Sequence, residues 1–423
     1  MPGTILIRGG RVIDPANGVD RVADVLLAAG KVAEVGKVRA SADEVIEAAG
    51  LIVTPGLIDI HVHFREPGNQ ETETIASGAA AAAAGGFTTV AVMPNTDPPV
   101  DNEAMVEFVR TQSTRAGAAN VRAIGTITRG RAGKDLAEMG QMARAGAVGF
   151  SDDGSWVRSA EVMRRAMEYA RMLGKPVISH AEDPELSAGG VMHEGYLSAV
   201  LGLAGIPAAA EEVAVARDII LCRMTGARLH LAHVSTVGAV EAIRWAKSAG
   251  LSVTAEVTVH HLMLTDECVR SFDPVYKMSP PLRSAEHLAA LREGLADGTI
   301  DCIVSDHAPH PLQEKDVEFD AAPFGVIGLE STLPIIITEL IRPGVLSWPD
   351  AVARLTTNPA RVLGLAKGTL SVGADADVTV IDPEVAWTID AGAFKSRSRN
   401  CPFHGAKVTG RAVAAIVAGI RKA

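Results

Sequence analysis

The feature of this sequence that most constrains its fold is a regular alternation of short apolar segments with longer helix-like ones through the middle of the chain. This alternation is typical of parallel strands joined by helices. Eight segments resemble buried strands: 57–63, 89–93, 121–126, 147–153, 176–180, 228–233, 252–258 and 301–307. Five intervening segments carry the apolar spacing of helices: 72–84, 160–173, 208–224, 239–248 and 286–295.

Eight such units predict an α/β protein with a (β/α)8 TIM-type barrel over residues 54–366. An open doubly wound sheet is the main alternative, but no Gly-x-Gly-x-x-Gly loop follows an early strand. Residues 1–53 and 367–423 have a different pattern, in which short apolar runs alternate with Gly, Asn and Asp turns. We therefore expect a small β-sandwich domain formed by both termini.

Charge and composition limit the possible partners and the location of the protein. The 40 basic and 50 acidic residues give a net charge of -10, and without a basic run we expect no nucleic-acid partner. We expect no signal peptide and no membrane span, because the apolar runs are too short or too interrupted. Four scattered cysteines without a Cys-x-x-Cys pair predict free thiols and a cytoplasmic protein.

Histidines and aspartates occupy the ends of five of the eight predicted strands. His61 and His63 are one residue apart, so both point to the same face of the first strand. The other four candidates end later strands: Asp153, His180, His233 and Asp306. Any one of them could be an ordinary buried polar residue. A barrel, however, brings the carboxyl ends of its strands to one mouth, so together they predict a metal site.

Four histidines and two carboxylates exceed the ligand set of a single tetrahedral zinc ion. They suit two metal ions that share a bridging carboxylate and a bridging hydroxide. Two cations lower the pKa of the shared water and polarise a carbonyl group under attack. The pattern therefore predicts hydrolysis, or its reverse.

Taken together, the motifs around these residues resemble those of the cyclic amidohydrolases of the amidohydrolase superfamily, and most closely the bacterial class I dihydroorotases. The resemblance covers nearly the whole chain. Its most specific parts are segments 59–68 (DIHVHFREPG), 93–96 (MPNT), 150–154 (FSDDG), 179–182 (SHAE), 305–310 (SDHAPH) and 400–405 (NCPFHG).

The resemblance implies a ligand set and a reaction. His61, His63 and Asp306 would hold one zinc ion, His180 and His233 would hold a second, and Asp153 would bridge them in place of the carboxylated lysine of many relatives. Asp306 would also carry the proton to the leaving ring nitrogen. The reaction implied is the reversible, zinc-dependent cyclisation of N-carbamoyl-L-aspartate to dihydroorotate and water, a step of pyrimidine synthesis.

The resemblance also implies substrate contacts. Arg65 offers a planar fork that suits a carboxylate, and Asn95 could complete that clamp or form a turn. His63 and His310 would also touch the substrate, although His310 could instead support a neighbouring ligand. The backbone of Phe324 and Gly325 would line the pocket.

One position departs from the family. Ser279 stands where the family has Asn in a Lys-Met-Asn-Pro-Pro-Leu-Arg motif, and its shorter side chain lacks the paired donor and acceptor of an amide. The polar segment 311–322 is expected to be either a moving lid or an inert loop.

Two other interpretations remain open. A hydantoinase or allantoinase would use the same scaffold, but an uncharged ring has no use for Arg65. A non-catalytic scaffold for aspartate transcarbamoylase would lose metal ligands, whereas this chain keeps all six.

As partners we expect a small-molecule substrate, with a homodimer and an association with aspartate transcarbamoylase as further expectations.

Overall fold

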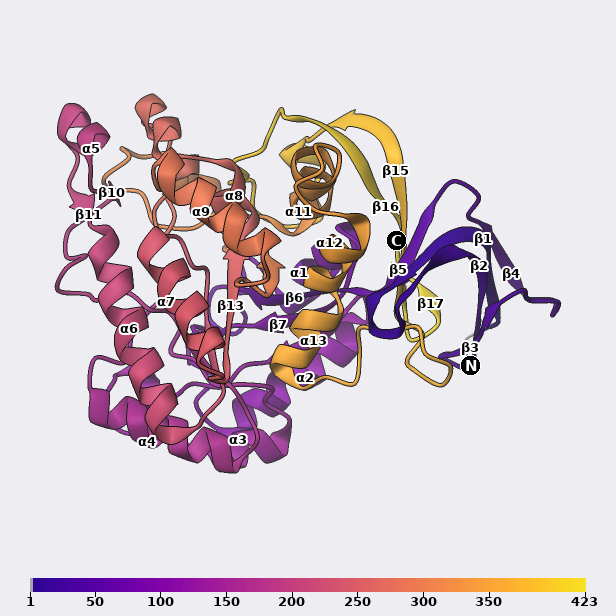
Figure 1. Ribbon diagram of the computed structural model, residues 1–423, viewed down its shortest axis with the longest axis horizontal. Helices are drawn as coiled ribbons and strands as arrows, with labels where there is room; N and C mark the ends of the chain where they lie inside the picture. Colours follow the sequence, from indigo (N-terminus) through magenta and orange to yellow (C-terminus); the bar gives the residue numbers. More distant parts are fainter. Residues whose placement is uncertain (1–2) are drawn as a thin grey trace.

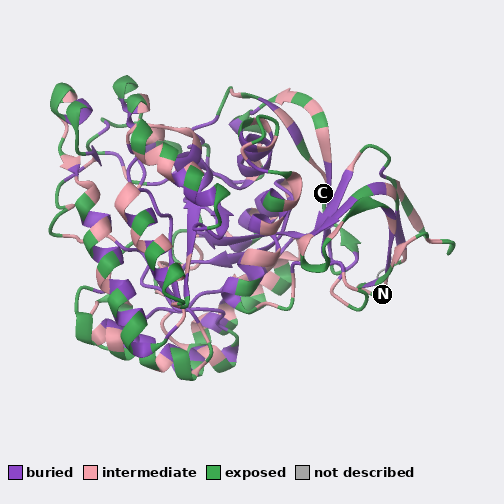
Figure 2. Ribbon diagram, in the orientation of Figure 1, coloured by how far each residue is buried: buried purple, intermediate pink, exposed green. Residues whose placement is uncertain are grey.

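The computed structural model describes residues 3–423, so residues 1 and 2 of the predicted N-terminal segment lie outside the described residues. A β-sheet with the chain termini occupies one side, and a larger body of parallel strands and helices occupies the other (Figure 1). Buried residues follow the strands at the centre of the larger body, while exposed residues follow its outer helices (Figure 2). The core therefore lies where the parallel strands meet the helices around them.

The first sheet unites strands from both ends of the chain. Its members are β1 (Ile5–Asp14), β2 (Val19–Ala28), β3 (Lys31–Gly36), β4 (Glu44–Glu47), β5 (Ile52–Pro55), β15 (Val378–Thr388), β16 (Lys407–Val417) and β17 (Ile420–Arg421). Their order is β17-β16-β15-β5-β1-β2-β3, with β4 beside β1. Because β5 pairs with both β1 and β15, it joins the N-terminal strands to the C-terminal ones.

The parallel strands of the larger body form two hydrogen-bonded groups. The first contains β6 (Leu57–Val62), β7 (Phe87–Val92) and β8 (Asn120–Ala123), and the second contains β9 (Val177–Ser179), β12 (Leu229–Leu231), β13 (Val253–Thr258) and β14 (Cys302–Val304). Every residue of β6 and β7 is buried, as expected for parallel strands covered on both faces. Single parallel bridges, Val62 with His307 and Phe150 with Gly125 and Val177, link the two groups at both ends.

The predicted strand over residues 147–153 is wrong as a regular strand, because only the two bridges of Phe150 form there. Gly146 and Gly149 flank the apolar residues of this short segment, and glycine weakens a strand because it costs more entropy to order. The other seven predicted strands are confirmed in position, although most are shorter than expected.

Helices surround the parallel strands. They are α1 (Ile75–Ala84), α2 (Glu103–Ala116), α3 (Met139–Ala145), α4 (Ala160–Met172), α5 (Tyr196–Leu201), α6 (Ala208–Thr225), α7 (Val237–Ser248), α8 (Val259–Met263), α9 (Ala285–Ala296), α10 (Leu312–Lys315), α11 (Leu329–Ile336), α12 (Trp348–Leu355) and α13 (Thr357–Leu363). Short 3-10 turns and one π turn are η1 (Pro15–Asn17), η2 (Arg129–Arg131), η3 (Asp266–Ser271), η4 (Pro274–Tyr276), η5 (Ile337–Ile341) and η6 (Ala391–Ala393). A further two-stranded sheet pairs β10 (Met192–His193) with β11 (Gly205–Ile206). The five predicted helices are confirmed as α1, α4, α6, α7 and α9.

Local chemistry explains where these helices begin and how closely they pack. Thr74 caps α1 by accepting a hydrogen bond from the backbone N–H of Ser77, whose hydroxyl accepts from the backbone N–H of Thr74 in return. A side chain at Gly78 would lie 2.4 Å from the Phe64 ring, so the small residues of α1 let it approach the loop after β6. Helix α1 thereby supports the segment that carries His63 and Arg65.

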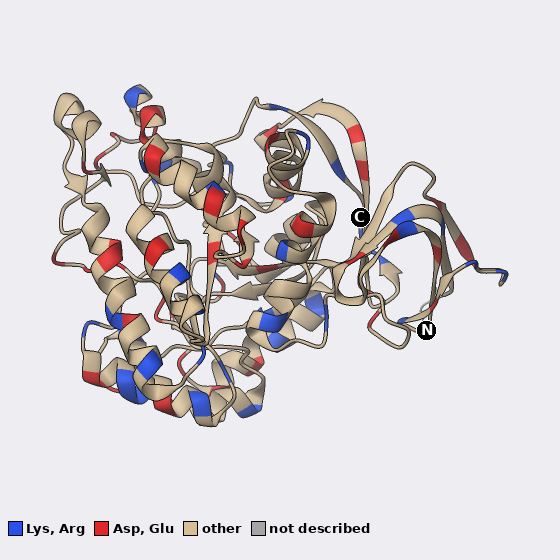
Figure 3. Cartoon of the chain, in the orientation of Figure 1, with Lys and Arg blue, Asp and Glu red and all other residues tan. Residues whose placement is uncertain are grey.

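The surface carries mixed charge. Basic and acidic residues both occur along the outer helices (Figure 3), and on α4 Arg164 pairs with Glu161 and Glu168. No helix within residues 3–423 combines the length and the apolar character needed to cross a membrane.

Candidate metal centre

The six predicted metal ligands lie at the carboxyl ends of the parallel strands, and all six are buried. His61 lies within β6 and His63 directly follows it. The others follow later strands or bridges in the chain: Asp153 after the Phe150 bridges, His180 after β9, His233 after β12 and Asp306 after β14. The folding of the chain therefore brings together residues that are up to 245 positions apart in sequence (positions 61 and 306).

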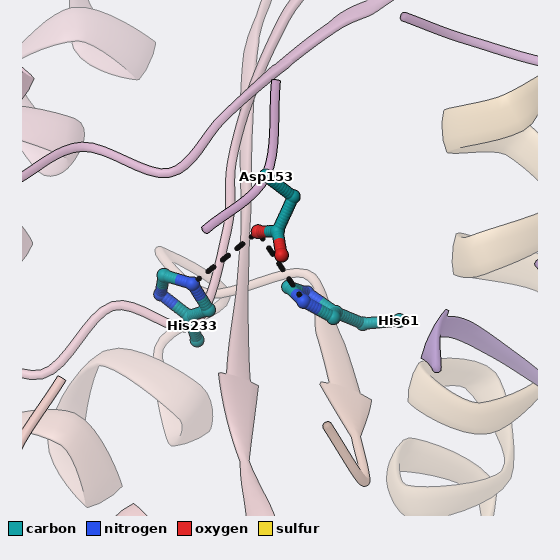
Figure 4. Close-up of side chains that lie close together, drawn as sticks. All are labelled: His61, Asp153 and His233. Atoms are coloured by element: carbon teal, nitrogen blue, oxygen red, sulfur yellow. Dashed lines mark ion pairs between the residues drawn. The ribbon is translucent and has the colours of Figure 1, made fainter. Parts of the chain in front are cut away.

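Asp153 lies among several imidazole rings. Its Oδ1 atom is 3.5 Å from His61 Nε2, 3.6 Å from His180 Nδ1 and 3.7 Å from His233 Nε2. Figure 4 shows the carboxylate between His61 and His233, with its oxygens directed toward both rings. These three residues form one group that could hold a metal ion.

Asp306 completes a second group that could hold a metal ion, together with His61 and His63. Its Oδ1 atom is 3.1 Å from His63 Nε2 and 3.5 Å from His61 Nε2. Burial penalises the charged form of Asp306, yet the neighbouring His61 and His63 rings hold its pKa below the usual value. Asp153 behaves in the same way, because His61 and the other rings outweigh its burial and keep its pKa well below normal. Both carboxylates are therefore ionised at neutral pH, which is the form that binds a cation.

Two hydrogen bonds set the tautomers of the first two histidines. His61 Nδ1 donates to Glu256 Oε1 at 2.5 Å, and His63 Nδ1 donates to Asn95 Oδ1 at 2.8 Å. Each bond directs Nδ1 away from the cluster and turns Nε2 toward it, so Nε2 is the atom that could bind a metal ion once its proton has left.

Glu256 is a functional residue that the sequence analysis missed. It lies in β13 and also contacts His230 Nε2 at 3.0 Å. Burial opposes its ionisation, but His61 and His230 bring its pKa to about 2. A glutamate inside a buried strand was the available signal, because an unpaired buried carboxylate is costly.

The backbone is strained at three positions of this site. Arg65, His233 and Asp306 have φ angles of 50°, 31° and 45°, a region that residues with a Cβ atom rarely occupy. Conformations of this kind persist where the surrounding structure fixes them, and they concentrate at functional sites.

Two atoms at the centre of the cluster support a metal site. Within residues 3–423, His61 Nε2 and Asp153 Oδ1 are buried without a hydrogen-bond partner. A buried polar atom left unsatisfied costs roughly 1–3 kcal/mol, and a cation bound to both lone pairs removes that cost. Imidazole nitrogens with carboxylate oxygens are the donor set that divalent zinc prefers. The residues present therefore fit a bound divalent metal ion.

A cavity of about 340 Å³ opens beside the cluster. Its lining includes ten of the twelve predicted site residues, namely His63, Arg65, Asn95, Asp153, His180, His233, Ser279, Asp306, Phe324 and Gly325. His61 and His310 do not line the cavity: His61 lies in the cluster beside Asp153, and His310 Nε2 is 2.8 Å from the carbonyl oxygen of the lining residue Phe324. Glu182 also lines the cavity, and its Oε2 atom accepts a hydrogen bond from Ser279 Oγ at 3.5 Å.

The segment after β14 lies close to this cavity and is held by a buried lysine. Lys315 Nζ donates to the carbonyl oxygens of Pro274, Lys277 and Pro323 at 2.8–3.1 Å. Burial lowers the pKa of Lys315 to about 7. Segment 311–322 thus contains the short helix α10, and both expectations for it, a moving lid and an inert loop, stay predictions.

Comparisons with known proteins agree with this chemistry. The family model described as dihydro-orotase-like matches residues 50–239. A dihydroorotase of Pelotomaculum thermopropionicum is 56% identical over 98% of this chain and 97% of its own length. A dihydroorotase of Syntrophotalea carbinolica is 53% identical, with 98% of both chains covered.

Solved structures with the same fold include cyclic amide hydrolases. The L-hydantoinase of Arthrobacter aurescens has a TM-score of 0.88 and 29% identity, with 100% of this chain and 96% of the other covered. The dihydropyrimidinase of Brevibacillus agri has a TM-score of 0.83 and 25% identity, with 99% and 94% covered. The two relatives that are similar in sequence are named as dihydroorotases, and the two solved structures are named as a hydantoinase and a dihydropyrimidinase. These names refer to different cyclic amides.

Proposed function

The chain belongs to the dihydroorotase family, and we propose that it interconverts N-carbamoyl-L-aspartate and dihydroorotate in pyrimidine synthesis. It is a cyclic amide hydrolase, as its relatives and structural neighbours indicate. The observation that carries the proposal is the arginine beside the His and Asp cluster. Arg65 and Asp306 line one cavity, so a ring with a carboxylate could bind Arg65 while its amide faces the cluster.

His61, His63 and Asp306 would hold one zinc ion, His180 and His233 would hold a second, and Asp153 would bridge the two. The unpartnered atoms of His61 and Asp153 support this assignment, as does the membership of His61 in both candidate groups. Bound there, the two cations would activate water and polarise the ring carbonyl.

Asp306 would serve as the catalytic acid and base. In ring opening its carboxylate would accept a proton from the attacking water and deliver it to the departing ring nitrogen, and in closure the transfers would reverse. Its ionised state and its position between the cluster and the cavity support this role.

Arg65 would bind the substrate carboxylate through its planar fork. The side-chain amide of Asn95 already accepts from His63 through its oxygen, which leaves its nitrogen available as a second donor to that carboxylate. His63, His310, Ser279 and the backbone of Phe324 and Gly325 would provide the remaining contacts.

The finer architecture is also proposed. Seven parallel strands and the Phe150 segment would close into a (β/α)8 barrel over residues 54–366, which is supported by the parallel bridges between the two strand groups. Residues 1–53 and 367–423 would form the β-domain. Its sheet would fold over a separate apolar core in the manner of a sandwich, because strands from both termini contribute to that core.

A hydantoinase is the second candidate, favoured by the structural neighbours. Arg65 argues against it, because its partly buried guanidinium fork would find no carboxylate partner on an uncharged ring. A non-catalytic scaffold is disfavoured because all six predicted metal ligands are retained.

The proposal also includes a homodimer, an association with aspartate transcarbamoylase and a cytoplasmic location. The four free cysteines support the cytoplasmic location.

The test is a substrate comparison. Loss of the ultraviolet absorbance of dihydroorotate should accompany turnover, and hydantoin and allantoin should react at least about a hundredfold more slowly because they lack the carboxylate. Removing metal with a chelator should abolish turnover, and zinc should restore it. Faster turnover of hydantoin than of dihydroorotate would refute the proposal.

A further inference from the structure

Asn400 lies far from the metal centre in sequence but touches the wall of the substrate cavity. Its side chain is buried, with 7% of the residue exposed. The amide nitrogen donates to the carbonyl oxygens of Ala308 and Gly325, at 3.2 and 3.1 Å, and the amide oxygen accepts from the backbone N–H of His310 at 3.4 Å. One amide therefore joins two parts of the loop that follows β14.

These hydrogen bonds flank the residue that holds Arg65. Asn400 binds Ala308 and His310, which lie on either side of Pro309. The carbonyl oxygen of Pro309 accepts from Arg65 Nε at 3.2 Å. Arg65 Nη2 also lies 3.4 Å from His310 Nε2, whose proton is directed to the carbonyl oxygen of Phe324. The orientation of the guanidinium group thus depends on a backbone segment that Asn400 fixes on both sides.

The direction of these bonds requires a neutral amide. Two of the three partners are carbonyl oxygens, which need a donor, and the third is an N–H group, which needs an acceptor. An aspartate would present only acceptors to the two carbonyl oxygens, and a leucine would satisfy none of the three groups. Asparagine provides both functions at this length.

We propose that Asn400 is a positioning residue for recognition of the substrate carboxylate. It acts through Pro309 on Arg65, so that the guanidinium fork is already aimed into the cavity when the substrate arrives. This inference rests on the proposed function. Pre-organisation of this kind lowers the cost of binding, and it affects binding more than the reaction that follows at the cluster.

The test uses Asn400→Ala and Asn400→Asp, with Asn358→Ala as the matched control. Asn358 also donates its amide to a buried backbone carbonyl, that of Asp301 at 2.8 Å, but at the opposite end of β14. Asn400→Ala should raise KM for dihydroorotate about tenfold, with kcat within about threefold and unchanged zinc content. Asn358→Ala should leave KM at the parent value. Asn400→Asp keeps the side-chain size and loses both donors, so it should raise KM even where alanine unfolds the chain.

A double-mutant cycle with Arg65→Lys separates positioning from a merely structural role. If Asn400 acts through Arg65, the double variant should have about the same KM as the worse single variant. Multiplied effects in the double variant, a parent-like KM in both Asn400 variants, or a loss of kcat with a loss of zinc would each overturn the inference. A parent enzyme without dihydroorotase activity would instead overturn the proposed function, so the two failures are distinguishable.

Discussion

At the scale of single residues, Asp153 is the group on which both proposed metal ions depend. Its Oδ1 atom lies 3.5–3.7 Å from nitrogen atoms of three histidines and has no hydrogen-bond partner within residues 3–423. An aspartate reaches less far than the carboxylated lysine implied for many relatives, so the positions of His61 and His233 must compensate. The positive φ of His233 is part of that local arrangement.

Asp153→Ala should therefore lower bound zinc and reduce turnover by more than about a hundredfold, because it removes the negative charge shared by two cations. Metal analysis of the purified protein and the dihydroorotate assay measure the two effects. Asp14→Ala is the control, since Asp14 is equally buried but accepts from Leu370 N in the terminal sheet. The control should lower stability and keep the zinc content of the folded protein. Full zinc content and activity in Asp153→Ala would contradict the bridging role.

Residue identities at the cluster were predictable because strand ends carry a local pattern. His61 and His63 alternate on one strand, and the later ligands recur at the same kind of position. Glu256 and Asn400 were not predicted as parts of the site. Glu256 acts through the far nitrogen of His61, and Asn400 acts over 92 positions of sequence on Ala308. Such hydrogen bonds between residues far apart in the chain produce no repeating pattern that a single sequence could show.

At the scale of elements, the first turn of α11 holds the segment that leads to Asn400. Glu330 accepts hydrogen bonds from the backbone N–H groups of Lys395 and Ser396, at 2.8–3.1 Å. Burial is the main reason that its pKa rises to about 7 from 4.5, and the nearby Glu73 adds to the rise. The two N–H groups and Arg399 act in the opposite direction.

This raised pKa gives stability a pH dependence of known sign. Between about pH 4.5 and 7 the folded state binds more protons at Glu330 than the unfolded state, so the free energy of unfolding should fall as pH rises. Glu330→Gln removes the titration. From pH 5 to 8 the parent should lose roughly 1–2 kcal/mol relative to this variant, a value reduced from the full linkage because the side chain is partly exposed. Urea unfolding of both proteins measures the difference, and parallel stability curves would contradict it.

Sequence patterns predicted elements best where one period extended over many residues. The five predicted helices have long amphipathic or small-residue faces, and each is found within a few residues of its expected bounds. Residues 147–153 failed as a strand because glycines interrupt a short apolar run. Glycines do not always interrupt a strand, because β1 continues through Gly9 and Gly10 with a register shift. A side chain at Gly10 would lie 2.5 Å from Val53, so glycine lets β5 approach closely there.

At the scale of the whole molecule, the chain termini contribute to one sheet, and the segment between β15 and β16 returns to the substrate cavity. The pairing of both termini was predictable because the two ends share a strand-and-turn pattern. The return of residues 396–400 to the cavity was not, because it depends on tertiary contacts with Glu73, Ala308 and Gly325. The segment between β15 and β16 therefore adds a second connection between the terminal sheet and the metal-centre cavity, besides the direct passage from β5 into β6.

The central claim is that the pocket interconverts an open dianion and a cyclic monoanion, and one measurement tests it directly. Carbamoyl aspartate carries two carboxylates and dihydroorotate carries one, so ring closure consumes a proton. With the purified enzyme, the equilibrium ratio of dihydroorotate to carbamoyl aspartate, approached from both directions between about pH 6 and 9, should rise about tenfold for each unit fall in pH. Asp306→Asn should slow the approach from both sides without changing the ratio, because a catalyst does not alter an equilibrium. A ratio independent of pH, or no approach to equilibrium from either substrate, would contradict the account.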